Sequence, residues 1–459
     1  MKIQLGSVCT LAGTLALTVG LVACGSAQRQ RYSQLEKQFF RAAERDRSFR
    51  QEKPGGKIDR DILDLGTFIK AVLAQNPSLD AARQAWRAAI EKYPQVNAVE
   101  DPTVEYAFAP LSIGSDAVRF GQVLSISQRL PWPGKISLAG DAALADAEAM
   151  QEHYAHARQQ LAFAASQLFY DYYAVTRSIE LNDEHKGLVE NIKATAEAQY
   201  RAGRASQQEP LQAEVELSHV IHKDLILKTR LAAIVASMNG LLHQRPEHSL
   251  PPPAEISLPS DIESKEDTER MQDRALKNRP ELRAWKSSIE AKQATVKLAD
   301  KKFFPDVGLM TSYNTMWRMS EHWWMVGVSL NVPIQIGARN GAERQAKADL
   351  SRVQAELASA EDQARVDVEH ARLGLLEANH VIHLYRERLL PAARAHIEAA
   401  RIGYETSRGS FQAYIDAERS LRRLELEFEE AKAQVGKKSA ALSRALGLMP
   451  GLKEEGSRR

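Results

Sequence analysis

The sequence predicts a mainly α-helical chain with a small β part. We expect its long helices to form an α-barrel and its four strands to join those of sister chains in a transmembrane β-barrel. Three observations predict this fold class. Glycine and proline are sparse, the chain contains an internal tandem duplication, and four short segments alternate between apolar and polar residues.

The composition favours long helices over a loop-rich enzyme. Among 459 residues there are 25 glycines and 18 prolines. Lys and Arg number 61 and Asp and Glu 59, so the formal net charge of +2 creates no strong field for a polyanion and argues against nucleic-acid binding. Both cysteines, Cys9 and Cys24, lie near the start, so the rest of the chain has no internal disulfide, cysteine zinc site or thiol nucleophile.

The N-terminus has the pattern of a secretory signal. Lys2 and an apolar stretch predict a signal peptide over residues 1–23. The sequence Leu21-Val22-Ala23-Cys24 resembles a bacterial lipobox, which implies lipidation at Cys24, and Gly25 in place of Asp implies sorting to the outer membrane. The alternative is a chance cysteine at an ordinary cleavage site. Residues 24–60 are expected to be an acylated N-terminal tether, with a solvated linker as the alternative.

The rest of the chain repeats itself. Pro102 recurs as Pro305, 203 residues later, and Pro131 recurs as Pro333, 202 residues later. The segment that starts at Tyr200 recurs 204 residues later. We therefore expect a first repeat over 61–248, a Pro-rich linker over 249–265, a second repeat over 266–449 and a C-terminal tail over 450–459.

Each repeat is expected to contain the same elements in the same order. Short helical segments, about 64–97 and 266–302, precede two strands and two long helices. The expected strands cover about 102–109, 118–128, 306–314 and 323–332. The expected long helices cover about 134–202, 206–243, 337–404 and 410–446. At 1.5 Å per residue the first would be on the order of 100 Å long, so the helices must pack side by side.

Strict alternation in the four strands predicts one lipid-facing side. The residues expected to face lipid are Val104, Tyr106, Phe108, Phe120, Leu124, Ile126, Val307, Leu309, Tyr313, Trp324, Val326, Val328 and Leu330. A soluble hairpin with one face on a core is the alternative. Because free strand edges cannot face hydrocarbon, copies must associate, and three chains of four strands would make a 12-stranded barrel. No later run of about 18 apolar residues is available for a spanning helix.

The duplicated order of short helix, strand pair and long helix pair, with a Tyr-x-x-Gly-x-x-Ser-type turn between the long helices, resembles the TolC outer-membrane efflux protein family. The resemblance covers the chain after about residue 60. Residues Gln128 to Lys135 are similar to the junction of the CzcC-like and CusC-like heavy-metal branch, although the second repeat lacks the Pro-Gly-Lys ending. The family implies a homotrimeric exit duct in the outer membrane that docks onto a periplasmic adaptor (membrane fusion) protein and an inner-membrane efflux pump.

In this family the turns between the long helices receive the adaptor. The matching adaptor-contact residues are Gly203, Arg204, Ala205, Arg408, Gly409 and Ser410. Gly203 and Gly409 are expected to adopt the left-handed backbone that reverses the chain, and simple turn chemistry explains them equally well. Gate charges are expected near these tips, at Arg394, Glu398, Arg401 and Glu405, and a solvated outer face is the alternative.

Histidine supplies the one metal-site pattern. Three pairs are spaced i, i+3 and so share a helix face: His153 and His156, His219 and His222, and His380 and His383. No further ligand pattern accompanies them, so we expect no metal and no cofactor. No nucleophile elbow, phosphate loop or His-Glu-x-x-His motif is present, which argues against an enzyme. The sequence thus predicts a passive gated export channel, with a lipid-anchored coiled-coil scaffold in the periplasm as the runner-up.

Overall fold

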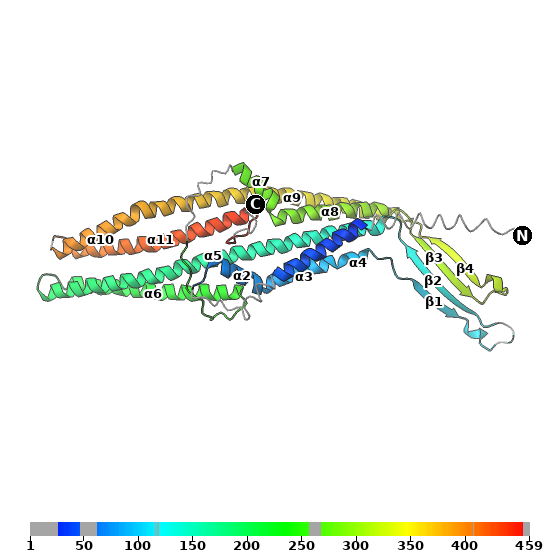
Figure 1. Ribbon diagram of the computed structural model, residues 1–459, viewed down its shortest axis with the longest axis horizontal. Coiled ribbons are helices and arrows are strands. Elements are labelled where there is room, and N and C mark those ends of the chain that lie inside the picture. Colours follow the sequence, from blue (N-terminus) through cyan, green and yellow to red (C-terminus); the bar gives the residue numbers. More distant parts are fainter. Residues whose placement is uncertain are drawn as a thin grey trace. The chain divides into compact units, whose positions relative to one another are not determined.

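The computed structural model describes residues 26–45, 62–114, 116, 119–256, 268–406 and 408–452. The predicted signal peptide, Cys24 and parts of the predicted tether, the linker and the tail lie outside these residues. Within the described chain, none of the helices has both the length and the apolar character that a bilayer span needs. The predicted fold class, mainly α with a small β part, is confirmed (Figure 1).

The chain divides into two compact units that cut across the duplication. Among the described residues, unit 1 contains 26–42, 82–154 and 281–360, and unit 2 contains the remainder. Each unit therefore takes part of both repeats. The repeats are units of sequence, and neither folds as a compact body by itself.

Unit 1 contains a four-stranded antiparallel sheet in the order β1-β2-β3-β4 (Figure 1). Its strands are β1 Thr103–Phe108, β2 Gln122–Leu130, β3 Val307–Asn314 and β4 Trp324–Leu330. The second strand starts later than predicted, so Phe120 precedes it. Gly121 N donates to Ser112 Oγ in the preceding turn, which ties this stretch to the loop.

The helices of unit 1 pack through aromatic side chains. They are the helical residues 26–42, most of α3 Pro77–Ile90, α4 Lys92–Val96, the first part of α5 Lys135–Arg201, nearly all of α8 Pro280–Lys301 and the first part of α9 Ile336–Leu384. The duplicated Pro77 and Pro280 occupy the first position of a helix, where the missing N–H costs nothing. Trp86 is fully buried between Phe39, 5.4 Å away, and Tyr154, 5.7 Å away, measured between ring centroids.

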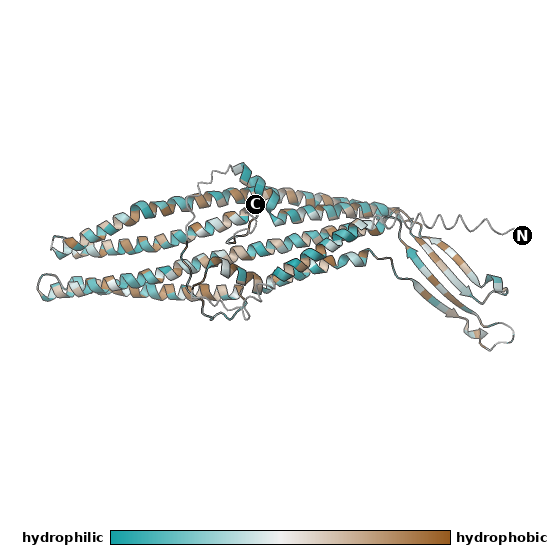
Figure 2. Ribbon diagram, in the orientation of Figure 1, coloured by the Kyte–Doolittle hydropathy of each residue, from teal (hydrophilic) through white to brown (hydrophobic). Residues whose placement is uncertain are grey.

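Unit 2 consists of helices from both repeats. They are α2 Leu65–Gln75, the rest of α5, α6 Gln208–Leu241, α7 Thr268–Asn278, the rest of α9, α10 Leu390–Glu405 and α11 Phe411–Ala445. Small residues allow close packing: Tyr170 covers Gly436, where an added Cβ would lie 2.2 Å from the ring. Apolar and polar residues are interspersed along the helices, and they alternate along the strands (Figure 2).

The predicted continuous helix over 337–404 is interrupted. A π-helical segment, Tyr385–Leu389, separates α9 from α10. Pro391 follows directly, and proline has no N–H for a helical hydrogen bond and crowds the carbonyl four residues before it. The wider π turn accommodates this loss without ending the helix.

Candidate functional site

The strand register places the predicted lipid-facing strand residues on one face of the sheet. Val104 lies opposite Ile126, Tyr106 opposite Leu124, and Tyr313 opposite both Leu124 and Trp324. Val326 is 86% exposed and Trp324 is 69% exposed. Within the described residues this apolar face is largely uncovered, although Trp323 packs on Tyr313 with ring centroids 5.9 Å apart. Soluble proteins usually expose apolar residues singly and not as a continuous face.

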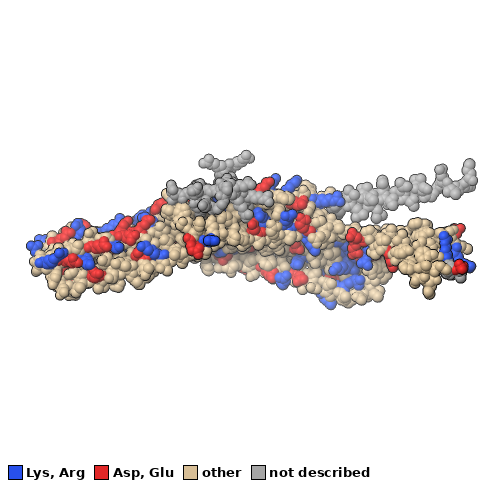
Figure 3. Space-filling model, turned by 90° about the horizontal axis from the view of Figure 1, so that it is seen from below, with Lys and Arg blue, Asp and Glu red and all other residues tan. Residues whose placement is uncertain are grey.

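The opposite face of the sheet is smaller and more polar. It includes Ser125, Ser127, Ser312, Ser329 and the charged Arg129. Val123, Met310 and Met325 are its large apolar exceptions. On the face drawn in Figure 3, charges of both signs are interspersed over the long helices, whereas the surface over the strands is largely uncharged. The sheet thus has one side suited to lipid and one suited to water.

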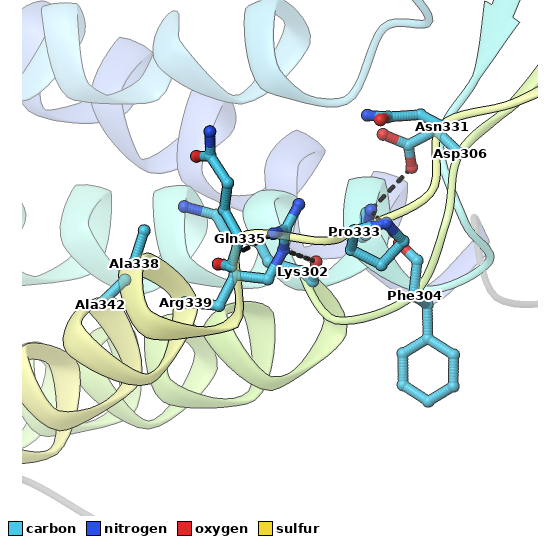
Figure 4. Close-up of a pocket in the computed structure, with 10 residues that line it drawn as sticks. Lys302, Phe304, Asp306, Asn331, Pro333, Gln335, Ala338, Arg339 and Ala342 are labelled. Atoms are coloured by element: carbon cyan, nitrogen blue, oxygen red, sulfur yellow. Dashed lines mark hydrogen bonds and ion pairs between the residues drawn. The ribbon is translucent and has the colours of Figure 1, made fainter.

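The junction between strands and helices is held by a polar cluster. Lys135, the first residue of α5, lies 2.7 Å from Asp306 Oδ1, which also accepts from Trp132 N at 2.9 Å. Trp132 stacks on Phe304 with centroids 5.4 Å apart. A cavity of about 320 Å³ opens beside this cluster (Figure 4). Its Arg339 donates to Lys302 O, so part of the cavity wall is held by an internal hydrogen bond.

The first tip, between α5 and α6, has the expected left-handed glycine. Gly203 has φ +68° and donates to Tyr200 O, while Arg204 N donates to Gln199 O. This pattern is the Schellman ending of a helix, which requires a left-handed residue at the turn. Gly203 and Arg204 are exposed and Ala205 is half-buried.

The second tip, between α10 and α11, corrects the sequence prediction for Gly409. Its φ is not positive, so it is not the left-handed residue. Gly409 N donates to Gly403 O, and a Cβ at Gly409 would lie 3.1 Å from the Gly403 carbonyl carbon. Glycine is favoured there because any other residue would crowd the backbone of Gly403. Arg408 and Ser410 are exposed, and Ser410 Oγ caps α11 by accepting from Ala413 N.

The four candidate gate residues already have partners within the chain. Arg401 pairs with Glu398 at 2.6 Å and with Glu405 at 3.1 Å along α10. Arg394 reaches across to Glu425 of α11 at 3.0 Å. These charges are well exposed except for Glu425, so each α10 pair contributes little to stability and exchanges partners readily.

The histidine pairs do not assemble a metal site within the described residues. No group of three His, Cys, Asp or Glu side chains in the described ranges is arranged to hold an ion. His383 Nδ1 lies 3.4 Å from Glu387, and His156 contacts Gln160 at 3.3 Å. His219, His222 and His380 are exposed, and His153 lies on the exposed side of α5.

A buried ionic cluster in unit 2 escaped the sequence analysis. His185 of α5 is 4% exposed; its Nδ1 lies 3.1 Å from Glu418 Oε1, and its Nε2 lies 2.9 Å from Glu425 Oε2. Both ring nitrogens face carboxylates, so the imidazolium is the favoured form. Burial by itself would lower the pKa of His185, but the hydrogen bonds to Glu418 and Glu425 raise it to about 9. The hydrogen bond from His185 lowers the pKa of Glu425, and Arg394 adds to this effect.

The same cluster extends to α6. Glu216 is 1% exposed and accepts from Arg419 and from Arg422, whose Nη2 is 2.6 Å away. Arg422 Nη1 also lies 3.9 Å from Glu418. Charged side chains therefore join α5, α6, α10 and α11. A long helix that carries one buried histidine gives no periodic signal, which is why the sequence did not reveal the cluster.

Comparisons with known proteins agree on one family and one fold. A family model described as outer membrane efflux protein matches residues 68–238 and 271–448. The outer-membrane channel OprN has 19% identity and a TM-score of 0.72, with 83% of this chain and 89% of that chain covered. CusC has 18% identity and a TM-score of 0.71, covering 84% and 92%. VceC from Vibrio cholerae has 18% identity and a TM-score of 0.70, covering 83% and 96%. None of the curated proteins compared with the chain matches it.

Replacing His185 should destabilise unit 2 strongly. His185→Ala removes the cation that hydrogen-bonds buried Glu418 and leaves this carboxylate with Arg422, 3.9 Å away. Breaking a buried pair costs about 3–5 kcal/mol. His219→Ala, on an exposed surface of α6, is the matched control and should change the free energy of unfolding by less than about 0.5 kcal/mol. Thermal unfolding of both variants checks this, and equal melting temperatures would contradict it.

The same histidine predicts the pH dependence of stability. In the folded protein its pKa of about 9 lies above the ordinary value of 6.5. The stabilisation that protonated His185 contributes to folding is therefore fully present below about pH 6.5 and is lost as the pH rises through about 9. The melting temperature of the wild type should therefore fall between pH 7 and 10 more steeply than that of His185→Gln. Parallel curves would show that His185 does not carry this contribution.

The two tip glycines should respond differently to substitution. Gly203→Ala meets no atom within 4 Å but keeps φ +68°, which costs an L-residue roughly 1–2 kcal/mol, and Gly203→Asn should cost less. Gly187→Ala, in open space within α5, should instead stabilise by up to about 1 kcal/mol. Denaturant unfolding measures all three, and a neutral Gly203→Ala would refute the left-handed turn.

Proposed function

This chain belongs to the outer membrane efflux protein family, as the resemblance to TolC predicted, and we propose on that basis that it is the outer-membrane channel of a tripartite efflux system. It would act as a passive, gated exit duct for small molecules or metal ions. An inner-membrane pump would supply the energy through a periplasmic adaptor. The chain itself would catalyse no reaction and hold no cofactor.

The observation that carries the proposal is the apolar face of the sheet together with its two free edges. In hydrocarbon an unpaired backbone N–H or C=O costs several kcal/mol, so an open four-stranded sheet cannot stay in a membrane alone. Association of three chains closes the sheet into a 12-stranded barrel with the apolar face outward. The serine-rich face then lines a water-filled interior.

The tips of the long helices are proposed to bind the adaptor. Gly203, Arg204 and Ala205 form one contact site. Arg408, Gly409 and Ser410 form the other. Their support is exposure combined with rigid turns: the Schellman ending fixes the first tip, and the contact of Gly409 with Gly403 fixes the second. A rigid exposed turn costs little entropy on binding.

The gate is proposed to use Arg394, Glu398, Arg401 and Glu405. In the closed channel these side chains would meet those of neighbouring subunits, and adaptor binding would return them to the pairs within one chain. Exposed ion pairs are worth up to about 1 kcal/mol each, so such an exchange is nearly balanced in energy. A gate that opens on binding needs this near balance.

A lipid on Cys24 would enter the same membrane as the strands. The helical residues 26–45 are fixed to α5 near Gln28, because Gln28 Nε2 donates to Ser137 O at 2.8 Å and to Asp141 at 2.6 Å. Ser137 and Asp141 lie in the first two turns of α5, which follows β2 after four residues. The proposed anchor therefore precedes a segment held at the strand–helix junction.

Conductance separates the channel from the coiled-coil scaffold. Purified protein added to a planar bilayer should produce stepwise currents, and mass measurement in gentle detergent should give a trimer. A scaffold would produce no steps, and a monomer would argue against a barrel. Loss of tolerance to zinc, copper, dyes or antibiotics in a deletion strain would then identify the exported class.

Charge on the apolar face should prevent assembly, whereas charge on the polar face should not. Val326→Lys places an ammonium toward lipid and should cost roughly 2–4 kcal/mol near the bilayer midplane. Ser127→Lys, on the opposite face, is the matched control and should leave assembly intact. The yield of membrane-extracted trimer measures both. Equal yields would contradict the assigned lipid-facing side.

A further inference from the structure

The free edges of the sheet carry their unpaired backbone groups at particular positions. In β1, Ala109 N donates to Gly121 O, so the odd-numbered residues bond to β2. In β4, Asn331 N donates to Asp306 O, so the odd-numbered residues bond to β3. Successive residues of an antiparallel strand point these groups to opposite sides. The even-numbered residues of β1 and of β4 therefore present their N–H and C=O groups to the open edges.

These same even-numbered residues have their side chains on the apolar face. They are Val104, Tyr106 and Phe108 on β1, and Trp324, Val326, Val328 and Leu330 on β4. A pairing that joins β4 to β1 must match even with even residues, because only these have free backbone groups. Such a pairing also joins two apolar faces into one continuous face, without a bulge.

The chain contains an internal template for this pairing. The β2–β3 contact pairs the second strand of the first repeat with the first strand of the second repeat. A β4–β1 contact between subunits would likewise pair the second strand of one repeat with the first strand of another. In the β2–β3 contact Leu130, the residue before Pro131, lies opposite Val307, which is two residues after Pro305. The duplicated prolines, Pro333 and Pro102, mark the corresponding places on β4 and β1.

We propose that β4 of each subunit pairs with β1 of the next subunit in the register of this template. The proposal rests on the trimeric channel proposed above and specifies which residues pair in the β4–β1 contact between neighbouring subunits, here called the seam. Val332 lies opposite the partner subunit's Val104. Leu330 then lies opposite the partner subunit's Tyr106, and Val328 opposite the partner subunit's Phe108.

The duplication supports this register independently of the backbone geometry. Pro305 follows Pro102 by 203 residues, whereas Pro333 follows Pro131 by 202. In the template, even-numbered residues of β2 lie opposite odd-numbered residues of β3. Because the two offsets differ by one residue, the corresponding pairs between β4 and β1 join even-numbered residues with even-numbered residues. These are the pairs that the free backbone groups require. Equal offsets would have matched an apolar position with a polar one. The apolar residues of β4 also continue beyond the strand to Val332, which is 67% exposed in the single chain and would be covered by the proposed pairing.

In the competing registers β4 is shifted along β1 by two residues, here called a slip. Such a slip keeps apolar side chains opposite apolar ones, because side chains alternate between the two faces of a strand with a period of two. The two hairpins of the chain differ by such a slip: Val104 lies opposite Ile126, whereas Val307 lies opposite Leu330 and not the equivalent Val328. The seam must therefore be tested at the level of single pairs. On the polar face the proposed register places Ser329 opposite the partner subunit's Ala107.

Disulfide trapping tests this pair directly. Ser329 and Ala107 are small, and at the seam they form a pair without mutual hydrogen bonds, in which side chains approach most closely. The full-length double variant Ser329→Cys with Ala107→Cys, oxidised in membranes, should give covalent trimers. The matched controls Ser329→Cys with Glu105→Cys and Ser329→Cys with Ala109→Cys represent the two slips. A slip moves the two Cβ atoms apart by about 7 Å along the strand, so covalent trimer should be about tenfold less abundant in each control.

The outcomes separate the register from the function. Dominant linkage in the Ala107 variant supports the proposed seam. A trimer that conducts but links best through Glu105 or Ala109, or through none of the three, overturns the register and leaves the channel intact. A monomer without conductance overturns the trimeric channel and the seam together. Each single-cysteine variant should give no covalent trimer, which excludes linkage through Cys24.

Discussion

The hydrogen-bonding capacity of the backbone is the constraint on which the rest of this molecule depends. A strand placed in hydrocarbon must pair every N–H and C=O, and a sheet of four strands leaves two edges unpaired. The chain therefore has an apolar face that needs lipid and edges that need further strands. In the proposed trimer both needs would be met by copies of the same chain, because the free backbone groups and the apolar side chains occupy the same positions on β1 and β4.

In unit 2 charged side chains are held away from water, and each is paired with an opposite charge. Long alanine-rich helices approach closely but offer little to fix their relative position along the axis. The cluster of His185, Glu418 and Glu216 supplies this specificity, because each buried charge has a defined partner on another helix. The exposed ion pairs of α10 join residues of the same helix and do not fix it against another helix. Burial thus separates the charges that fix the helices from those suited to a moving part.

The repeats, the alternating strands and the long helices could be predicted from the sequence because each rests on a periodic pattern. Features that depend on tertiary contact could not. Gly203 and Gly409 both lie in turns between long helices, yet of the two only Gly203 is left-handed, since the role of Gly409 is set by its contact with Gly403. His185 lacks a signal because its partners come from the other repeat, more than 230 positions away. The gate charges could be located along α10, but their neighbours in an assembly lie beyond a single chain.

The π turn at Tyr385–Leu389 lies on the stretch where the two duplicated copies differ in length. Pro131 and Tyr200 are 69 positions apart, whereas Pro333 and Tyr404 are 71 positions apart. In a regular α-helix two further residues would rotate every later side chain by about 200°. A π turn takes up one residue more than an α turn, so it offsets about half of this rotation. The irregularity thus lets the longer copy keep a continuous helix from α9 into α10, with a smaller change in the direction of the side chains on α10.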